Sequence, residues 1–388
     1  MKGKILTINA GSSSLKFALF ERDDLAETTR GEIENLHTSP RFSARDAAGN
    51  VISQAWPAEM PFAEALEKLL DFADAHLDGG DIAAVGHRVV SGGLLHVAPA
   101  LVTPALLQDL QALTPLDPMH MPCNLAPISA VAAGRPGLTQ VACFDTAFHH
   151  SLPEIARIFA VPRAMTEEGV RRYGFHGLSY EYISGKLRQD FPELAAKRLV
   201  AAHLGAGASL CALDSGVSIA TTTGFSALEG LIMATRCGRL DPGVLLYLAA
   251  QGKSFSEIEH ILYHDCGLLG VSGISGDVRD LLASAEPNAR QALDLFTYQT
   301  ACEIGGLAVA LGGLEGLIFT AGIGEHAPAI RASICARLAW LGLDLDPEAN
   351  NANAALISRP ASRIQVRVIA TDEEAMIARH TYALTLAR

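Results

Sequence analysis

The chain opens with two short strand patterns joined by a polar turn. Residues 4–9 are rich in aliphatic and β-branched side chains, and residues 15–19 alternate large apolar positions with Lys and Ala. A two-residue period of this kind is typical of a half-buried strand. Between them, residues 11–14 read Gly-Ser-Ser-Ser, which is turn chemistry. The pattern predicts a strand, a glycine-serine turn and a second strand.

A similar unit recurs near mid-chain. Residues 199–203 have a strand pattern, residues 205–209 read Gly-Ala-Gly-Ala-Ser, and residues 210–213 have a second strand pattern. The two units are displaced by about 195 residues, close to half of the 388-residue chain. A repeat at that spacing favours a duplicated domain. Two similar lobes would leave a cleft between them for a ligand.

The remaining pattern alternates helices and strands, which predicts an α/β protein. Residues 61–77 have the period of an amphipathic helix, and residues 114–127 are proline-rich and read as irregular. Strand patterns at 82–90 and 141–144 end next to polar residues, and residues 301–320 read as a buried helix that runs into a strand.

Composition narrows the class of protein. The length suggests two domains, and 49% hydrophobic with 19% charged residues is a globular balance. A net charge of −12 argues against binding to nucleic acid or to an anionic membrane surface. Seven cysteines without a CxxC pair argue against a disulfide framework and a zinc site. No apolar run reaches the ~18 residues of a membrane span, so a cytoplasmic location is expected.

Four glycine-rich turns are candidates for phosphate binding, because backbone N–H groups must approach an anion closely there. None of them is a Walker loop, and none has the glycine spacing of a dinucleotide site. Any one of them is more simply a plain turn. Four of them, two in similar hairpins, favour a phosphate-binding function. They lie at residues 11–14, 205–209, 273–276 and 322–324.

Polar residues that follow apolar strands form a second group of candidates. Arg88 ends one such strand before a glycine pair, Asp145 directly follows another, and His176 and Arg236 lie in glycine-containing segments. Each alone is more simply a satisfied polar residue or a helix cap. Together they match the needs of phosphoryl transfer, which requires cations around the transferred group, a metal and accurate positioning.

These segments carry a resemblance to the acetate kinase family, which belongs to the superfamily of acetate and sugar kinases and actin-like ATPases. The resemblance runs from Ile5 to about Arg379. It implies two actin-like (ribonuclease H-like) lobes around a nucleotide cleft, formed by residues 1–147 with 374–388 and by residues 148–373, and a homodimer. The matching blocks are residues 6–17, 86–93, 144–153, 171–183, 203–209, 224–242, 319–326 and 371–378.

The resemblance also implies roles for individual residues. The positions that match the catalytic groups are Arg88, Asp145, His176 and Arg236. The positions that match the substrate site are Arg88, Val90, Met119, Phe175 and Ala227. The positions that match Mg²⁺ ligands, for which Mn²⁺ can substitute, are Asn9 and Glu373. The positions that match the ATP or ADP site are Ser12, Ser14, Lys16, His203, Leu204, Gly205, Ala206, Gly207, Asp277, Val278, Arg279, Gly322, Ile323, Gly324, Glu325 and His326.

Asp145 matches an aspartate that is usually described as an acid or base. A short-chain carboxylic acid has a pKa close to that of a Glu side chain, about 4.3, and is ionised at pH 7. The substrate therefore has no proton for Asp145 to remove. We expect Asp145 to orient Mg²⁺ or Arg88 instead.

The expected activity is reversible, Mg²⁺-dependent phosphoryl transfer between ATP and acetate, giving acetyl phosphate and ADP. Several positions depart from the family pattern: Ser91, Leu178, Tyr180, Ala206, Thr223, Ala227, Arg239 and His326. Ala227 could enlarge the acyl pocket, so a kinase for propionate or another short-chain acid stays open as an alternative. A nucleotide-binding protein without catalysis is a further alternative, and a sugar kinase is disfavoured because Arg88 and small apolar walls suit a carboxylate.

Overall fold

The computed structural model describes residues 3–11, 14–36, 39–58, 60–77 and 79–386. By its internal contacts the chain divides into two compact units: unit 1 is Met1–Phe148, Gly177–Tyr182 and Asp372–Arg388, and unit 2 is His149–His176 and Ile183–Thr371. Helix α6 (Gly177–Asp190) and the short helix η2 (Ala147–Ser151) cross from one unit to the other. The predicted lobe boundaries stay a prediction.

Unit 1 is built on an eight-stranded sheet with the order β5-β4-β3-β2-β1-β6-β8-β7. The strands are β1 (Gly3–Ala10), β2 (Leu15–Glu21), β3 (Glu27–Glu34), β4 (Arg41–Asp46), β5 (Val51–Ala55), β6 (Asp81–Val89), β7 (Ala100–Leu101) and β8 (Gln140–Phe144). The helices are α1 (Phe62–Ala75), α2 (Pro104–Ala112), η1 (Thr114–Leu116), α3 (Met121–Gly134) and α16 (Glu373–Leu386). Strands β1, β6 and β8 run parallel, so their carboxyl ends meet at one edge of the sheet.

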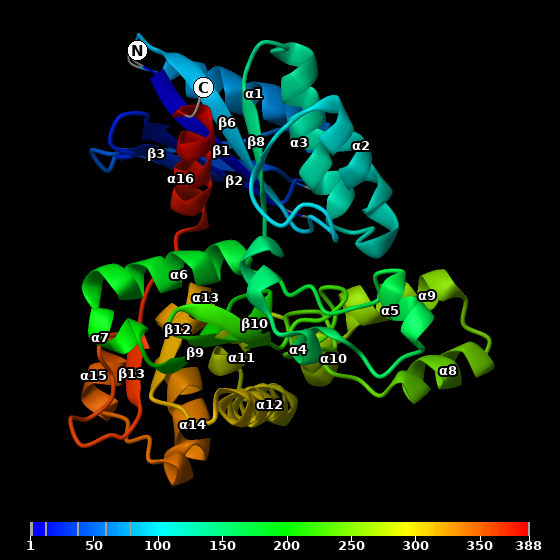
Figure 1. The fold of residues 1–388 in the computed structure, drawn as a ribbon, viewed down its shortest axis with the longest axis vertical. Helices are drawn as coiled ribbons and strands as arrows, with labels where there is room; N and C mark the ends of the chain where they lie inside the picture. The colour runs from blue at the N-terminus through cyan, green and yellow to red at the C-terminus, as the bar shows by residue number, and fades with distance from the viewer. Residues whose placement is uncertain (1–2, 12–13, 37–38, 59, 78, 387–388) are drawn as a thin grey trace. The chain divides into compact units, whose positions relative to one another are not determined.

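Helices cover both faces of the unit 1 sheet. Apolar residues of α1 pack with those of β1 and β2 on one face, while α16 packs against β1, β6 and β8 on the other (Figure 1). Gly86 on β6 shows how closely α16 approaches, because a Cβ atom there would lie 2.2 Å from Thr381 Oγ1 and 2.5 Å from Ile377 Cγ2. A larger residue at this position would push the C-terminal helix off the sheet. The last helix of the chain is thereby fixed beside its first strand.

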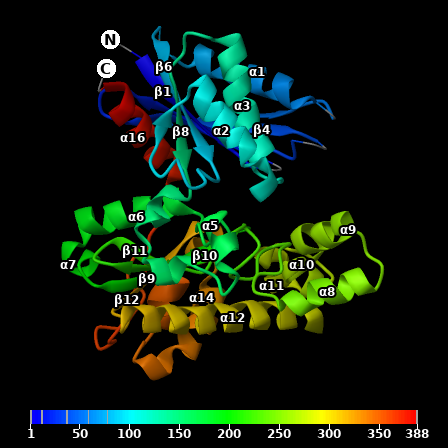
Figure 2. The ribbon, with the colours of Figure 1, turned by 45° about the vertical axis from the view of Figure 1, so that its right-hand side comes forward.

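Unit 2 is built on a five-stranded sheet with the order β11-β10-β9-β12-β13. The strands are β9 (Arg198–Leu204), β10 (Ala208–Asp214), β11 (Val217–Thr221), β12 (Gly316–Thr320) and β13 (Gln365–Val368). The 25-residue helix α12 (Pro287–Leu311) packs against β9, β10 and β11 and runs along the unit in Figure 2. The other helices are α4 (Glu154–Arg157), α5 (Arg163–Glu167), α7 (Pro192–Ala195), α8 (Pro242–Ala250), α9 (Phe255–His260), η3 (Ile261–Asp265), α10 (Gly267–Ser272), α11 (Val278–Ala283), α13 (Ala321–His326), α14 (Pro328–Arg337), η4 (Ala339–Leu341) and α15 (Pro347–Asn351).

The two sheets share one topology. The order β3-β2-β1-β6-β8 in unit 1 corresponds to β11-β10-β9-β12-β13 in unit 2, and in each the first three strands are antiparallel and the last two run parallel to the strand before them. This confirms the predicted duplicated α/β fold. The hairpin pairs Asn9–Lys16 and His203–Ser209 correspond, which gives offsets of 194 and 193 residues. The predicted offset of about 195 exceeds these by one and two residues. The offset falls from 194 to 193 across the hairpin because residues 205–207 are one residue fewer than residues 11–14.

Two local predictions were wrong. Residues 114–127 are not irregular throughout, because α3 begins at Met121. Pro122 lies in the first turn, where no N–H is needed, and the buried side chains of the helix outweigh the hydrogen bond lost at Pro127. Residues 322–324 are not a turn but part of the short helix α13. Among the described residues, no helix is both long and apolar enough to cross a membrane.

Candidate active site

In unit 1, three predicted residues meet at the carboxyl ends of parallel strands. Asn9 lies at the end of β1, Arg88 at the end of β6, and Asp145 directly after β8. The backbone N–H of Asp145 donates to the carbonyl oxygen of Val89 at 3.0 Å, which continues the pairing of β6 with β8. Glu373 joins them from the first turn of α16. The topology therefore gathers residues that are up to 364 positions apart.

Arg88 and Asp145 form a buried ion pair. The Arg88 Nε and Nη2 atoms both donate to Asp145 Oδ2, at 3.0 and 2.6 Å. Burial raises the pKa of Asp145, and the Arg88 guanidinium opposes that rise. Burial lowers the pKa of Arg88, but the carboxylates of Asp145 and Glu373 outweigh it, so that pKa is raised overall. The other oxygen of Asp145, Oδ1, is buried and has no hydrogen-bond partner among the described residues.

Asn9 connects this ion pair to two glutamates. Its Oδ1 atom accepts a hydrogen bond from Arg88 Nη1 at 3.2 Å. Its Nδ2 atom donates to Glu373 Oε2 at 3.0 Å and to Glu374 Oε1 at 3.1 Å. Glu374 was not among the predicted site residues. The sequence feature that could have identified it is the pair of adjacent glutamates at 373–374. Only Glu373 matches a metal ligand of the family.

The oxygen atoms of this cluster suit a hard divalent cation. Among the described residues no group of three or more His, Cys, Asp or Glu side chains forms a ready metal site. Mg²⁺ does not require a group of three such side chains, because it is commonly held by one or two carboxylates together with water and substrate phosphates. The unpartnered Asp145 Oδ1 and the carboxylate of Glu373 are donors of that kind. The residues therefore fit the predicted ion.

In unit 2, His176 lies against the second hairpin. Its Nδ1 atom is 2.8 Å from Ser209 Oγ, and its ring stacks on that of His203 at 4.3 Å between centroids. A Cβ atom on Gly207 would lie 3.0 Å from His176 Nε2, so the glycine turn leaves room for the imidazole. His176 has a left-handed backbone with φ of 59°, which is costly for a residue other than glycine.

The turn of the second hairpin, Gly205–Gly207, lies next to two other predicted segments. Gly205 N–H donates to the carbonyl oxygen of Gly207 at 3.0 Å, and Ala234 N–H donates to that of Ala206 at 3.1 Å. The second bond ties the turn to the segment that carries Arg236. Thr320 pairs with His203 in the sheet, and α13 with residues 322–326 follows directly. The structure thus gathers these predicted phosphate-binding segments within unit 2.

Arg236 is held beside the predicted acyl-site residue Ala227. Its Nη1 atom donates to the carbonyl oxygen of Ala227 at 3.2 Å and lies 3.7 Å from the sulfur of Met233. A Cβ atom on Gly267 would lie 2.8 Å from the Arg236 backbone nitrogen. Gly267 also has φ of 66°. Both this left-handed backbone and the close contact with Arg236 therefore require glycine at position 267.

The remaining predicted residues are divided between the two units. Val278 is buried in the core of unit 2, and Asp277 caps α11 and binds the exposed Arg279 at 2.6 Å. Val90 and Met119 belong to unit 1, whereas Phe175 and Ala227 belong to unit 2. Ser14 and Lys16 lie on the first hairpin, and Ser12 lies outside the described residues.

A buried pair next to Met119 was missed. His120 Nδ1 is 2.8 Å from Asp117 Oδ1, and the other carboxylate oxygen of Asp117 is buried with no hydrogen-bond partner among the described residues. Burial raises the pKa of Asp145, and His120 is among the groups that oppose this rise, so the pair lies within electrostatic reach of the Arg88 cluster. The sequence signal is the three-residue spacing of Asp and His at the start of α3, which is too common to be specific.

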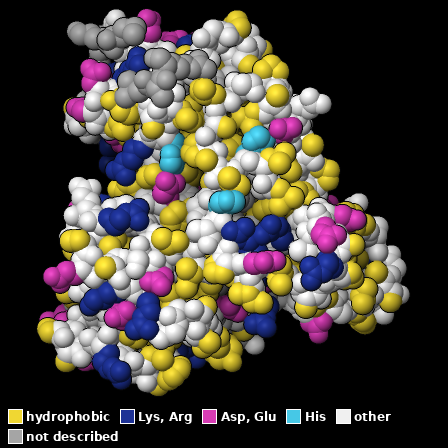
Figure 3. Space-filling model, viewed as in Figure 1, with side chains coloured by type: hydrophobic (Ala, Val, Ile, Leu, Met, Phe, Trp, Pro, Cys, Tyr) yellow, Lys and Arg dark blue, Asp and Glu magenta, His cyan; other side chains and the backbone are white. Residues whose placement is uncertain are grey.

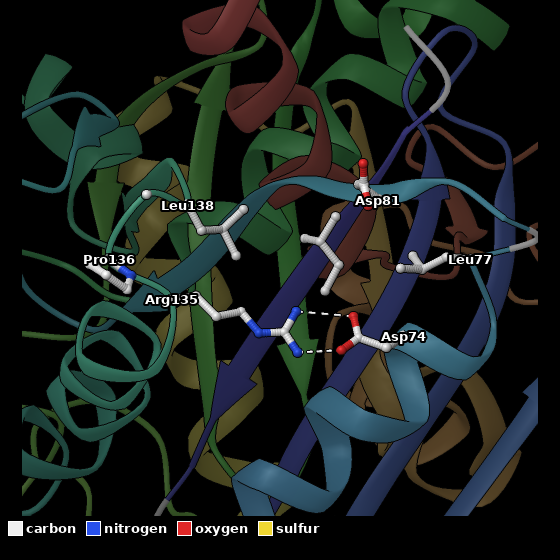
Figure 4. Close-up of a pocket in the computed structure, with 8 residues that line it drawn as sticks. Asp74, Leu77, Asp81, Arg135, Pro136 and Leu138 are labelled. Atoms are coloured by element: carbon white, nitrogen blue, oxygen red, sulfur yellow. Dashed lines mark hydrogen bonds and ion pairs between the residues drawn. The ribbon is translucent and has the colours of Figure 1, made fainter.

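A pocket of about 370 Å³ lies elsewhere on unit 1, and an ion pair between Asp74 and Arg135 crosses it (Figure 4). Arg135 Nη1 donates to Asp74 Oδ1 at 3.0 Å. The pocket is lined by Asp74, Leu77, Asp81, Ile82, Arg135, Pro136, Gly137 and Leu138. None of the predicted site residues is among them, so this pocket is separate from the candidate site.

Comparison with known proteins agrees with this arrangement. The profile of the Acetokinase family matches residues 4–379. An acetate kinase of Rhodopseudomonas palustris (strain TIE-1) is 50% identical over 396 residues, with 99% of each chain covered, and one of Rhizobium meliloti is 48% identical with 98% of each covered. A propionate kinase structure from Francisella tularensis subsp. tularensis SCHU S4 has a TM-score of 0.91 at 34% identity, covering 98% of this chain and 99% of that one. An acetate kinase structure from Porphyromonas gingivalis has a TM-score of 0.86 at 33% identity and covers all of both chains.

The duplicated fold, the arginine–carboxylate cluster and these matches define a phosphotransferase with a carboxyl group as acceptor. The chain belongs to the acetokinase family.

Proposed function

We propose that the chain transfers the γ-phosphoryl group of ATP to the carboxylate of acetate, giving acetyl phosphate and ADP, and that it catalyses the reverse reaction. The observation that carries this proposal is the Arg88 guanidinium, held by Asp145 and Asn9 at the carboxyl ends of β6, β8 and β1. Ligands of open α/β sheets bind at such strand ends. A planar guanidinium suits a carboxylate or phosphate better than any other side chain.

The proposed mechanism is mostly electrostatic. Arg88 orients the acceptor carboxylate, while His176 and Arg236 stabilise the negative charge of the transferring phosphoryl group. Backbone N–H groups of the turn at 205–207 bind phosphate oxygens of the nucleotide. We propose that Asn9, Glu373 and Asp145 hold Mg²⁺, which neutralises phosphate charge when bound. Asp145 acts by orienting Arg88 and the ion, since the acceptor carboxylate has no proton to lose at pH 7.

Acetate is favoured over propionate as the substrate because the relatives at 46–50% identity are named acetate kinases. A pocket that discriminates by one methylene gains only about 1–3 kcal/mol, so propionate is expected as a slower substrate. The test is a panel of two- to five-carbon acids with Mg²⁺-ATP, in which hydroxylamine traps the acyl phosphate. Product with acetate above an Arg236→Ala control supports the proposal, and no product with either acetate or propionate contradicts it.

We also propose that the chain forms a homodimer through α8. None of the residues of α8, all of which are described, is buried, although the helix is strongly apolar. Leu246 is 74% exposed and Tyr247 61% exposed, and Figure 3 shows hydrophobic side chains at the surface where Figure 1 labels this helix. An exposed apolar face of this kind is typical of a protein–protein interface. We propose a second copy of this chain as the partner, because the family resemblance implies a homodimer.

Replacing Leu246 with Glu is expected to shift the protein from dimer to monomer. A hot-spot residue at an interface contributes about 2 kcal/mol, or roughly 30-fold in dissociation constant. Light scattering after size exclusion measures the change. Val309→Glu is the matched control, because Val309 is 81% exposed on a different helix. Equal masses for the wild type and Leu246→Glu at low micromolar concentration would contradict the proposal.

A further inference from the structure

A continuous path of hydrogen bonds runs from the third strand of unit 1 to the Arg88–Asp145 ion pair. It begins at Arg30 on β3, whose Nη1 atom donates to Glu374 Oε2 at 3.1 Å. Glu374 Oε1 accepts from Asn9 Nδ2 at 3.1 Å, and Asn9 Oδ1 accepts from Arg88 Nη1 at 3.2 Å. Arg88 then holds Asp145 Oδ2 at 2.6 Å. Neither Arg30 nor Glu374 takes part in the proposed phosphoryl transfer itself.

The partners of Asn9 leave its amide only one orientation. Ionised glutamates can only accept hydrogen bonds, and a guanidinium can only donate them. Both hydrogens on Asn9 Nδ2 must therefore face Glu373 and Glu374, and its oxygen must face Arg88.

Arg30 supplies the positive charge that faces Glu374. In this ion pair the Glu374 side chain is buried, whereas the Arg30 side chain is 39% exposed. Arg30 therefore brings a positive charge from the sheet surface to a buried carboxylate.

A second set of contacts anchors the Arg30 guanidinium. Its Nη2 atom lies 2.7 Å from Asp372 Oδ2 and 2.5 Å from Glu27 Oε2, so it bridges β3 to the residues just before α16. Asp372 also accepts a hydrogen bond from Ala375 N–H in the first turn of that helix, at 2.9 Å. The start of α16, which carries Glu373 and Glu374, is thereby tied to β3 through one arginine.

We propose that Arg30 and Glu374 are positioning residues for phosphoryl transfer: they fix the orientation of the Asn9 amide and, through it, the Arg88 guanidinium. This role rests on the proposed function, because it gives Asn9 and Arg88 their purpose. Neither residue contacts the reacting atoms. When a residue that holds a metal or substrate ligand in place is replaced, activity or metal affinity typically falls 10- to 100-fold.

The first test replaces Arg30 with Gln and compares it with Arg41→Gln, an exposed arginine at the start of the adjacent strand β4. We expect Arg30→Gln to lower kcat by about 10-fold, and Arg41→Gln to leave it within twofold. Arg30→Lys keeps the charge but not the three-way contact, and should recover part of the loss. If Arg30→Gln lowers only the thermal midpoint and leaves kcat unchanged, the role is structural and the proposal is wrong.

The second test reverses the polarity of one hydrogen bond. Asn9→Asp places a third carboxylate against Glu373 and Glu374, so it should lose more activity than Asn9→Ala. In the double variant Asn9→Asp with Glu374→Gln, the new amide can donate to Asp at position 9 and accept from Arg30. We expect the double variant to regain at least 10-fold over Asn9→Asp. No recovery in a folded double variant would overturn the proposal.

A readout that is independent of activity separates this proposal from the proposed function. In ¹⁵N-labelled protein, the Asn9 side-chain NH₂ signals can be assigned by their loss in Asn9→Ala. We expect these hydrogens to exchange with water at least 10-fold faster in Arg30→Gln than in the wild type or Arg41→Gln, because Glu374 is no longer held in place to accept from Asn9. Equal exchange rates would contradict the positioning role. A wild type that makes no acyl phosphate would contradict the function and leave this measurement valid.

Discussion

Replacing Arg88 with Ala is expected to lower kcat/KM for acyl phosphate formation by about 10³-fold, the upper end of the loss seen when one preorganised charge donor is removed. The change removes the cation that we assign to the acceptor carboxylate. It also leaves Asp145 buried without its counter-charge and Asn9 Oδ1 without its donor. Hydroxylamine trapping with acetate and Mg²⁺-ATP measures the rate.

The same change should also destabilise unit 1. Removing one partner of a buried ion pair typically costs about 3–5 kcal/mol, because the remaining charge stays desolvated. Arg88 has 16% of its side chain exposed and Asp145 none, so the lower end of that range applies. Arg135→Ala is the control, since it breaks the more exposed ion pair with Asp74 on the same unit. Activity of a folded Arg88→Ala variant within threefold of wild type would disprove the assigned role.

Replacing Asp145 with Asn should raise the KM for acetate about 10-fold and lower kcat about 100-fold. The Asn amide oxygen can still accept from Arg88, but the negative charge that orients the guanidinium is lost. A charged partner contributes more than a neutral one, so both the binding and the orientation of the acceptor weaken. Initial rates over a range of acetate and Mg²⁺ concentrations give the two constants separately.

The two roles considered for Asp145 differ in this result. An organiser of Arg88 affects KM and kcat together, because Arg88 holds the acceptor in both the ground and the transition state. A general base acts only in the transition state, so its loss lowers kcat and leaves KM unchanged. A fall in kcat with an unaltered KM for acetate would therefore refute the organising role that we assign to Asp145.

The predicted site residues that the structure brings together are those whose signals lie within a short block of sequence. Arg88 and Asp145 end strands that could be recognised from their apolar runs, and the structure places both at one edge of the sheet. His176 and the turn at 205–207 were likewise recognised as candidates, and they lie together in unit 2. The roles of these residues stay predictions until the variants are measured.

Prediction from sequence was weakest where local signals conflict with packing. Pro127 argued against a helix at 114–127, yet α3 includes it because the buried side chains on either side hold the helix against the sheet. The glycines at 322–324 indicated a turn, yet they lie in α13 directly after β12. In both places tertiary contacts overrode the preference of single residues.

The amino-acid sequence by itself determined the α/β class, the two similar hairpins and the family, because these depend on periodicity and on long contiguous motifs. Only the tertiary structure decided which residues share a hydrogen-bond network. Arg30 and Glu374 are 344 positions apart, and Asn9 and Glu373 are 364 apart, so no local pattern links them. The orientation of Asn9 follows from that network, since carboxylates only accept and guanidinium groups only donate.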